Sequence, residues 1–209
     1  MMRLYYLFAF VMLVLGCKEE TKPPVKHALP PSQKVYLEGK TASMNLPLTF
    51  KRSSRYLLER DIPAFQKNQF ALWMFQQRLE RLEFQDSEID VFADTTSDLH
   101  FLMILNMPHT PINKQAGNLL NGQINQMWRK IQASSGNLIN VEKAGEATIR
   151  GVGKTTVLKF KHKVSFLMMQ ENVEFHTVFI VTSEYRTLMI MEVSENENDV
   201  EEYLWTLKN

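Results

Sequence analysis

The first candidates for chemistry in this sequence are its five histidines, above all His162 and His176. Each of the two lies in a segment where apolar and polar residues alternate, as they do in a β-strand. A turn centred near Gln170 would bring the two segments together and place the imidazoles diagonally adjacent, within reach of each other. Two imidazoles with a carboxylate such as Glu174 could bind zinc, so His162 and His176 are candidate metal ligands. The alternative is that both are packed, hydrogen-bonded residues of a sheet.

The other three histidines offer no comparable arrangement. His27 lies in a polar stretch with several prolines, and His100 and His109 flank a predicted strand with no second ligand at a useful spacing. The sequence therefore predicts no cofactor.

A glycine-rich segment, Gly151 to Thr156, imitates the end of a phosphate-binding loop. In the motif G-x-x-x-x-G-K-T, however, the first glycine would fall on Thr148, and the Lys-Thr pair should open a helix. Residues 157–164 instead alternate like a strand. The segment is therefore interpreted as a hairpin turn, and no nucleotide is expected as a partner.

Catalytic motifs are equally scarce. The sequence has no G-x-S-x-G nucleophile elbow and no order of His, Asp and Ser whose spacing favours a triad. The sequence therefore offers no candidate catalytic residue, and this favours a protein that is not an enzyme. The alternative is a lipid-tethered hydrolase or metal-dependent enzyme with an unrecognised site.

The only cysteine, Cys17, belongs to a different kind of site. Arg3 precedes an apolar run from Leu4 to Leu15, and the small residue Gly16 comes directly before the cysteine, which is the layout of a secretory signal peptide. The run is too short to cross a membrane, which takes about 20 apolar residues. A lone cysteine also cannot form an internal disulfide.

The segment Val14-Leu15-Gly16-Cys17 resembles the bacterial lipobox. The resemblance implies cleavage between Gly16 and Cys17, diacylglycerol on the Cys17 sulfur, and a fatty acid such as palmitate on the new amino group. Two or more acyl chains hold a protein stably on a membrane, at about 0.8 kcal/mol per buried methylene. Residues 1–16 are thus predicted to be a signal peptide and Cys17 a lipid anchor.

Residues 17–43 are predicted to be a tether because Pro23, Pro24, Pro30 and Pro31 interrupt a polar stretch. Within it, residues 35–37 could already contact the folded domain. The start of the tether, residues 18–20, resembles the short Lys and acidic signal that marks some lipoproteins for the outer face of the outer membrane. The expected location is the cell envelope, on the outer membrane or the cell surface.

Charge argues against a nucleic-acid partner. The chain has 24 basic and 23 acidic residues, and removal of the signal peptide takes away Arg3 alone, so the mature chain is formally neutral. Nucleic-acid binding requires a basic face. The hydrophobic content of 44% suffices for a core, and residues 44–209 are expected to form one domain.

Two stripes of apolar residues at helical spacing organise that domain. One runs from about Pro63 to Leu82, and the other begins at Thr110-Pro111, a cap followed by proline, and ends near Ser134. Strands are expected at 44–50, 89–93 and 100–107, and four more form a meander between Gly136 and Val193. A closing helix of about ten residues follows, with Leu204 facing the core and Glu201 facing solvent.

The hairpin from Val173 to Val193 is apolar on both faces, so both faces should be covered. One predicted face consists of Val178, Ile180, Met189 and Met191, and the other of Phe179, Val181, Leu188 and Ile190. This pattern predicts an α+β fold, a mainly antiparallel sheet of about six to seven strands covered by helices on both faces.

The element order, with residues 185–191 followed by an amphipathic helix, resembles the PsbP-like fold. That fold is shared by an extrinsic protein of photosystem II and a Ran-binding nuclear transport factor, which have no function in common, so the resemblance implies no activity. The sequence therefore predicts a noncatalytic envelope lipoprotein. Its expected partners are the membrane, through lipid on Cys17, and an envelope protein or a small ligand.

Overall fold

The computed structural model describes residues 31–37, 42–54, 57–67, 69–80, 89–136, 138–167, 173–197 and 199–208. The predicted signal peptide, Cys17 and the first part of the predicted tether lie outside these residues. None of the helices in the described ranges is long and apolar enough to cross a membrane.

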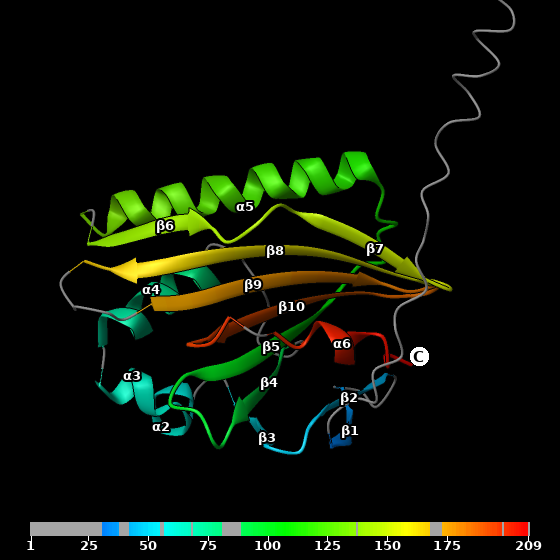
Figure 1. Cartoon of the computed structure of the whole chain (residues 1–209), viewed down its shortest axis with the longest axis horizontal. Helices are drawn as coiled ribbons and strands as arrows, with labels where there is room; N and C mark the ends of the chain where they lie inside the picture. The colour runs from blue at the N-terminus through cyan, green and yellow to red at the C-terminus, as the bar shows by residue number, and fades with distance from the viewer. Residues whose placement is uncertain are drawn as a thin grey trace, which may run out of the picture.

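An eight-stranded antiparallel sheet forms the centre of the molecule, with a separate two-stranded sheet beside it (Figure 1). The strands are β1 Ser32–Tyr36, β2 Ser43–Pro47, β3 Phe50–Ser53, β4 Ile89–Asp94, β5 His100–Met107, β6 Ile139–Lys143, β7 Thr148–Val152, β8 Thr155–Phe166, β9 Val173–Thr182 and β10 Thr187–Ser194. The helices are α2 Leu58–Asp61, α3 Pro63–Lys67, α4 Gln69–Glu80, α5 Lys114–Ser134 and α6 Glu201–Leu204. The α+β class and the mainly antiparallel sheet are thus as predicted.

The strand order in the large sheet is β3-β4-β5-β10-β9-β8-β6, and β7 also pairs with β8. β6 pairs with the second half of β8 and β7 with the first half, so the two form one interrupted edge strand. The interruption contains Gly145, whose φ of 124° is readily adopted only by glycine. The predicted meander is present, with its first strand broken at this point.

Both faces of the β9–β10 hairpin are buried, in the two sets that the alternation predicts. Val178, Ile180, Met189 and Met191 belong to one core cluster. Phe179, Val181, Leu188 and Ile190 belong to the other. The centre of the sheet therefore separates two hydrophobic cores.

Helices cover the first face. The stripe Ile124, Trp128 and Ile131 of α5 is buried against it, as are Met74 and Phe75 of α4. Figure 1 shows α5 lying along the β6–β7 edge. The spacing of three and four residues in both stripes explains why one side of each helix enters the core.

The second face differs from the prediction, because its main cover is not a long helix. Met44 and Leu46 of β2 and Leu204 of α6 pack there, next to Phe179. Backbone hydrogen bonds in both directions between Ser43 and Lys208, of 2.9 and 2.8 Å, join the C-terminus to β2. The two-stranded sheet and the short α6 together close this core.

The folded part also begins earlier than the predicted boundary at Met44. β1 lies within the expected tether and pairs with β2, and Leu37 is only 4% exposed. The tether prediction is therefore wrong for residues 32–34, and residues 35–37 contact the domain as the sequence analysis allowed. Its polar composition hid a strand whose partner, β2, supplies most of the apolar residues of the pair.

Helix α5 starts later than the predicted cap at Thr110. Asn113 caps it instead, its side chain accepting a hydrogen bond from the Ala116 backbone N–H at 2.8 Å. Thr110 serves another purpose, since its backbone N–H donates to the Thr187 hydroxyl at 2.9 Å and its carbonyl accepts from Thr182 at 3.1 Å. These bonds hold the loop before α5 against the end of the sheet.

The closing helix is one turn long rather than ten residues, and Glu201 does not face solvent. Glu201 is 8% exposed and accepts hydrogen bonds from Arg150 and Lys159, both at 2.9 Å. Asp199 adds a second carboxylate on Lys159, at 2.5 Å. Burial alone would lower the pKa of Lys159, but these two carboxylates raise it above 10.5. The ion pairs dock α6 on the sheet.

Candidate functional site

The structure brings the two predicted histidines together. His162 on β8 and His176 on β9 are direct cross-strand partners, rather than diagonal neighbours as the sequence suggests. Both are buried, with exposed fractions of 4% and 1%. His176 Nε2 lies 2.9 Å from Glu174 Oε2, and His162 Nε2 lies 3.3 Å from Asn125 Oδ1 of α5.

No metal site follows from this pair. Within the described ranges, no group of three or more His, Cys, Asp or Glu side chains is arranged to hold a metal ion. His162 Nε2 and His176 Nε2 make hydrogen bonds to an amide and a carboxylate, respectively, as is common for packed sheet residues. The zinc hypothesis for His162 and His176 is not supported.

Trp128 of α5 lies over both imidazoles. Its ring centroid is 5.7 Å from that of His162 and 5.1 Å from that of His176, and the second pair is close to perpendicular. The helical stripe that buries Ile124 and Ile131 also places Trp128 here. A helix side chain therefore covers the polar pair in the sheet.

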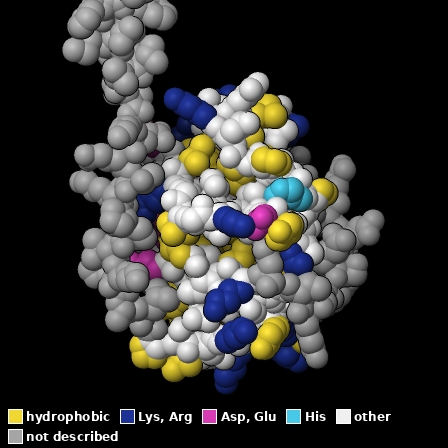
Figure 2. Space-filling model, turned by 90° about the vertical axis from the view of Figure 1, so that its right-hand side faces the viewer, with side chains coloured by type: hydrophobic (Ala, Val, Ile, Leu, Met, Phe, Trp, Pro, Cys, Tyr) yellow, Lys and Arg dark blue, Asp and Glu magenta, His cyan; other side chains and the backbone are white. Residues whose placement is uncertain are grey.

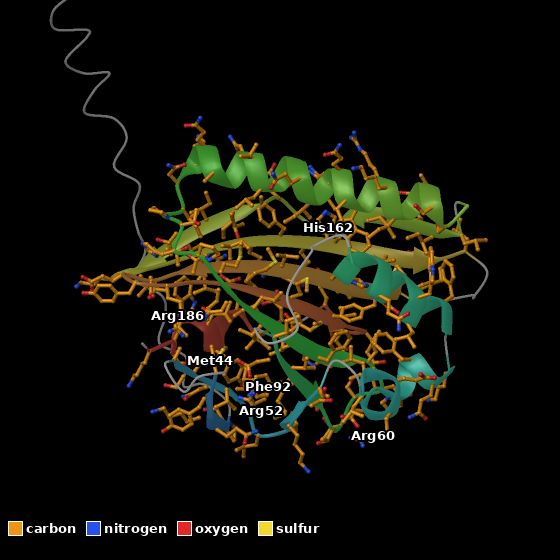
Figure 3. All side chains as sticks on the ribbon, turned by 180° about the vertical axis from the view of Figure 1, so that it is seen from behind. Met44, Arg52, Arg60, Phe92, His162 and Arg186 are labelled. Atoms are coloured by element: carbon orange, nitrogen blue, oxygen red, sulfur yellow. The ribbon has the colours of Figure 1, made fainter. Side chains whose placement is uncertain are left out.

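Beside Trp128, a hollow of about 180 Å³ opens between α5 and the β6 edge of the sheet. It is lined by Asn125, Trp128, Arg129 and Gln132 of α5, Val141 and Lys143 of β6, and His162 of β8. Figure 3 shows His162 beneath α5, next to this edge. The hollow connects the buried histidine to solvent.

The residues along α5 that face the edge strand differ in size. Near its N-terminus the helix approaches the edge strand so closely that a Cβ on Gly117 would lie 3.0 Å from the Ile149 side chain on β7. Further along, the larger side chains of Arg129 and Gln132 stand beside β6 and line the hollow.

The hollow combines an apolar wall with several polar groups. Its described lining holds two cations, two amides and an imidazole against an apolar wall of Trp128 and Val141. Of these groups, the imidazole of His162 and the ammonium of Lys143 are of types that also serve as bases or nucleophiles in enzymes. Small-molecule sites commonly combine apolar walls with a few polar groups.

A second buried polar cluster was missed by the sequence analysis. His100 Nε2 lies 2.8 Å from Glu192 Oε1, and His100 Nδ1 lies 3.3 Å from Asp94 Oδ2. The other Glu192 oxygen accepts from the Val200 backbone N–H at 3.3 Å, just before α6. The available signal was the acidic Glu192 within an otherwise apolar strand, since a buried carboxylate needs a partner.

Burial and charge shift both groups in this cluster towards their protonated forms. Burial lowers the pKa of His100, but the hydrogen bond to Glu192 and the nearby carboxylates outweigh it, and the pKa lies above its ordinary value of 6.5. Burial raises the pKa of Glu192 above 4.5. The cluster ties the segment before α6 to the sheet, so we interpret it as structural.

The remaining sequence candidates do not join a site. His109 lies on the exposed loop before α5, and His27 and Cys17 are outside the described residues. The glycine-rich segment forms the predicted turn between β7 and β8, with Gly153 at a φ of 60° and Lys154 bound to Glu184 at 2.7 Å. Figure 2 views the end of the molecule that carries this turn, where lysines and arginines are spread among apolar side chains.

No family model matches the sequence, and no curated protein matches it. Among solved structures, the chain is similar to cyanobacterial PsbP (CyanoP) from Synechocystis sp. PCC 6803, determined in solution. The TM-score is 0.48 and the identity 8%, over 88% of this chain and 95% of that chain. This neighbour has the fold that the element order resembles. At these values the similarity transfers no activity, ligand or partner.

Proposed function

We propose that this protein is a lipid-anchored binding module of the cell envelope, and that the hollow between α5 and β6 holds a small ligand. The observation that carries the proposal is the lining of the hollow. A buried imidazole and an indole form its inner wall, and polar side chains stand at its mouth. This combination suits reversible binding of a small molecule.

The location in the envelope rests on the sequence. The apolar run before Cys17 and the lipobox-like Val14 to Cys17 support export, cleavage and lipidation. The resemblance of residues 18–20 to a sorting signal supports the outer membrane or the cell surface. We further infer, from element order, that the domain has a PsbP-like fold. A module of this kind would hold its ligand at the membrane for another envelope protein.

The lipid anchor has a direct test. Metabolic labelling with a fatty-acid probe should mark the wild-type chain and should fail to mark the Cys17→Ser variant. The variant should also leave the membrane fraction. A Cys17→Ser protein that still pellets with membranes and is released only by detergent would contradict the anchor.

The ligand site is tested by filling the hollow. Val141→Phe should occupy its apolar wall, whereas Val152→Phe places the same side chain on the same edge strand, at an exposed position outside the hollow. Native mass spectrometry of protein extracted mildly from membranes should show a bound small molecule in wild type and Val152→Phe, and none in Val141→Phe. Equal loading of both variants would contradict the proposed site.

A further inference from the structure

We infer that the ligand of this hollow is an anion, bound through a carboxylate or a phosphate group by Arg129 and Lys143. The inference rests on the proposed function, because it assigns a chemical class to the ligand of the same site. Three features support this inference: the positive charge at the mouth of the hollow, the polar groups of its floor, and its size.

The charge of the mouth is entirely positive among the described residues that line it. Arg129 comes from α5 and Lys143 from β6, so the two cations stand on opposite walls. Neither forms an ion pair within the described part of the chain. By contrast, Lys154 and Lys159 bind carboxylates of other segments at 2.5–2.9 Å. The pair at the hollow is thus available to an anion from solution.

The acid that precedes Lys143 in the sequence points away from the hollow. Glu142 lies next to Lys143 in β6, but successive strand residues point to opposite faces of the sheet. Its Oε1 atom accepts a hydrogen bond from the Asn140 side chain at 2.8 Å, on the face away from α5. The guanidinium of Arg129 can bind a carboxylate or a phosphate through two parallel hydrogen bonds.

The floor of the hollow supplies further polar groups. Asn125 Oδ1 faces His162 Nε2, and Asn125 Nδ2 donates to Asn121 Oδ1 at 3.1 Å, so the orientation of the Asn125 amide is fixed. The Gln132 amide lies about two helical turns further along α5, on the same wall. An anion held by the two cations would have its non-ionic part against Trp128 and Val141.

The size of the hollow suits a small ligand or a small group of a larger one. At about 30 Å³ for each water molecule in the liquid, a hollow of 180 Å³ has room for about six waters. A carboxylate or phosphate group with a short organic body fits this space. A polymer chain could enter only with one end or one side group.

The test uses the indole signals of the full chain in detergent micelles, labelled with ¹⁵N only at tryptophan. The chain has three tryptophans, and Trp128 lines the hollow while Trp73 on α4 and Trp205 after α6 pack elsewhere. Titration with inorganic phosphate and with acetate, at constant ionic strength set with chloride, should shift the Trp128 signal saturably and leave the other two in place. The two titrations distinguish a phosphate ligand from a carboxylate ligand.

Charge variants identify the groups responsible. Arg129→Gln and Lys143→Gln should each raise the dissociation constant of the anion, read from the saturable shift, about tenfold or more. Each variant removes one of the two charged partners. Lys130→Gln is the matched control, since Lys130 is an exposed cation on the same helix that does not line the hollow. It should leave the titration unchanged.

Three outcomes would overturn the inference. Trp128 could fail to shift with either anion, the Lys130→Gln variant could weaken binding as much as Arg129→Gln, or a neutral probe such as 2-propanol could bind while both anions do not. The last result would show that the hollow binds a neutral ligand, which contradicts the anion but not the proposed function. Failure of neutral and anionic probes alike would contradict both.

Discussion

Leu204 of α6 offers the sharpest test of how the second core is closed. Its side chain is fully buried, with 0% exposure, in the cluster formed by β2, β10 and α6. Helix α6 is a single turn, and helices this short do not persist in water without packing partners. The order of the C-terminal segment therefore depends on buried side chains and on the ion pairs of Glu201 and Asp199.

The expected cost of Leu204→Ala follows from this burial. The change removes three carbon atoms, which at about 0.8 kcal/mol each gives about 2.4 kcal/mol of lost transfer free energy. The cavity left behind adds to this, and measured Leu→Ala changes in cores span about 2–5 kcal/mol. For a domain of this size, a loss of about 3 kcal/mol lowers the Tm by roughly 6–12 °C.

The assay is urea unfolding of the full chain in detergent, followed by far-UV circular dichroism. Glu202→Ala is the matched control, because Glu202 is exposed on the same helical turn. It should change the free energy of unfolding by less than about 0.5 kcal/mol. Equal and small effects of Leu204→Ala and Glu202→Ala would mean that α6 does not close a core, and the assignment of the second face would be wrong.

Two further predictions concern the buried cluster and the start of the fold. The raised pKa of His100 contributes stability that is fully present below about pH 6.5, the ordinary value, and is lost as the pH rises through the folded-state pKa. The free energy of unfolding should therefore fall as the pH rises above about 6.5. His100→Gln should flatten this slope, while His109→Gln, on the exposed loop, should leave it intact. A slope unchanged in His100→Gln would contradict the reasoning. A chain that begins at Pro31 should unfold cooperatively, with a urea midpoint close to that of the full chain. A chain that begins at Ala42 lacks β1 and the buried Leu37, so its free energy of unfolding should be lower by several kcal/mol. Equal midpoints for the two truncated chains would show that β1 contributes nothing to the fold.

The parts of the fold that could be predicted are those in which one local pattern decides the structure. The apolar residues on both faces of β9 and β10 predict a central hairpin, and the two sets fall into two separate cores. The stripe of Ile124, Trp128 and Ile131 likewise predicts the buried side of α5. In each case the periodicity of the apolar residues predicts which side is buried, without information from distant parts of the chain.

Errors arose where the outcome depended on a distant partner. β1 lacks a strong apolar pattern and is ordered by pairing with β2. Glu201 has the composition of a surface residue, but Arg150 and Lys159 from the sheet compensate its burial. The histidine pairing needed the centre of the β8–β9 turn, and a shift of the centre by one residue changes the partner of His162 by two.

The candidate site was accessible to sequence analysis only in part. His162 attracted attention as a histidine on an apolar strand face, but Arg129 and Lys143 look like ordinary exposed residues of a helix and a strand. What makes them a pair is the packing of α5 beside β6, which places both side chains in the lining of one hollow. No local pattern near Arg129 records that packing.

The candidate ligand site lies at the edge of the sheet, outside the two filled cores. Over β9 and β10 the two faces are filled by large side chains such as Phe179 and Met191. The β6–β7 edge differs, because Gly145 interrupts the strand and the hollow opens beside β6. Gly117 packs near β7, outside the lining of the hollow. Gly117→Ala would place a Cβ 3.0 Å from Ile149 Cδ1, the flexible end of a side chain, and a shift of a few tenths of an ångström there would accommodate it, so the hollow around Arg129 should keep its shape.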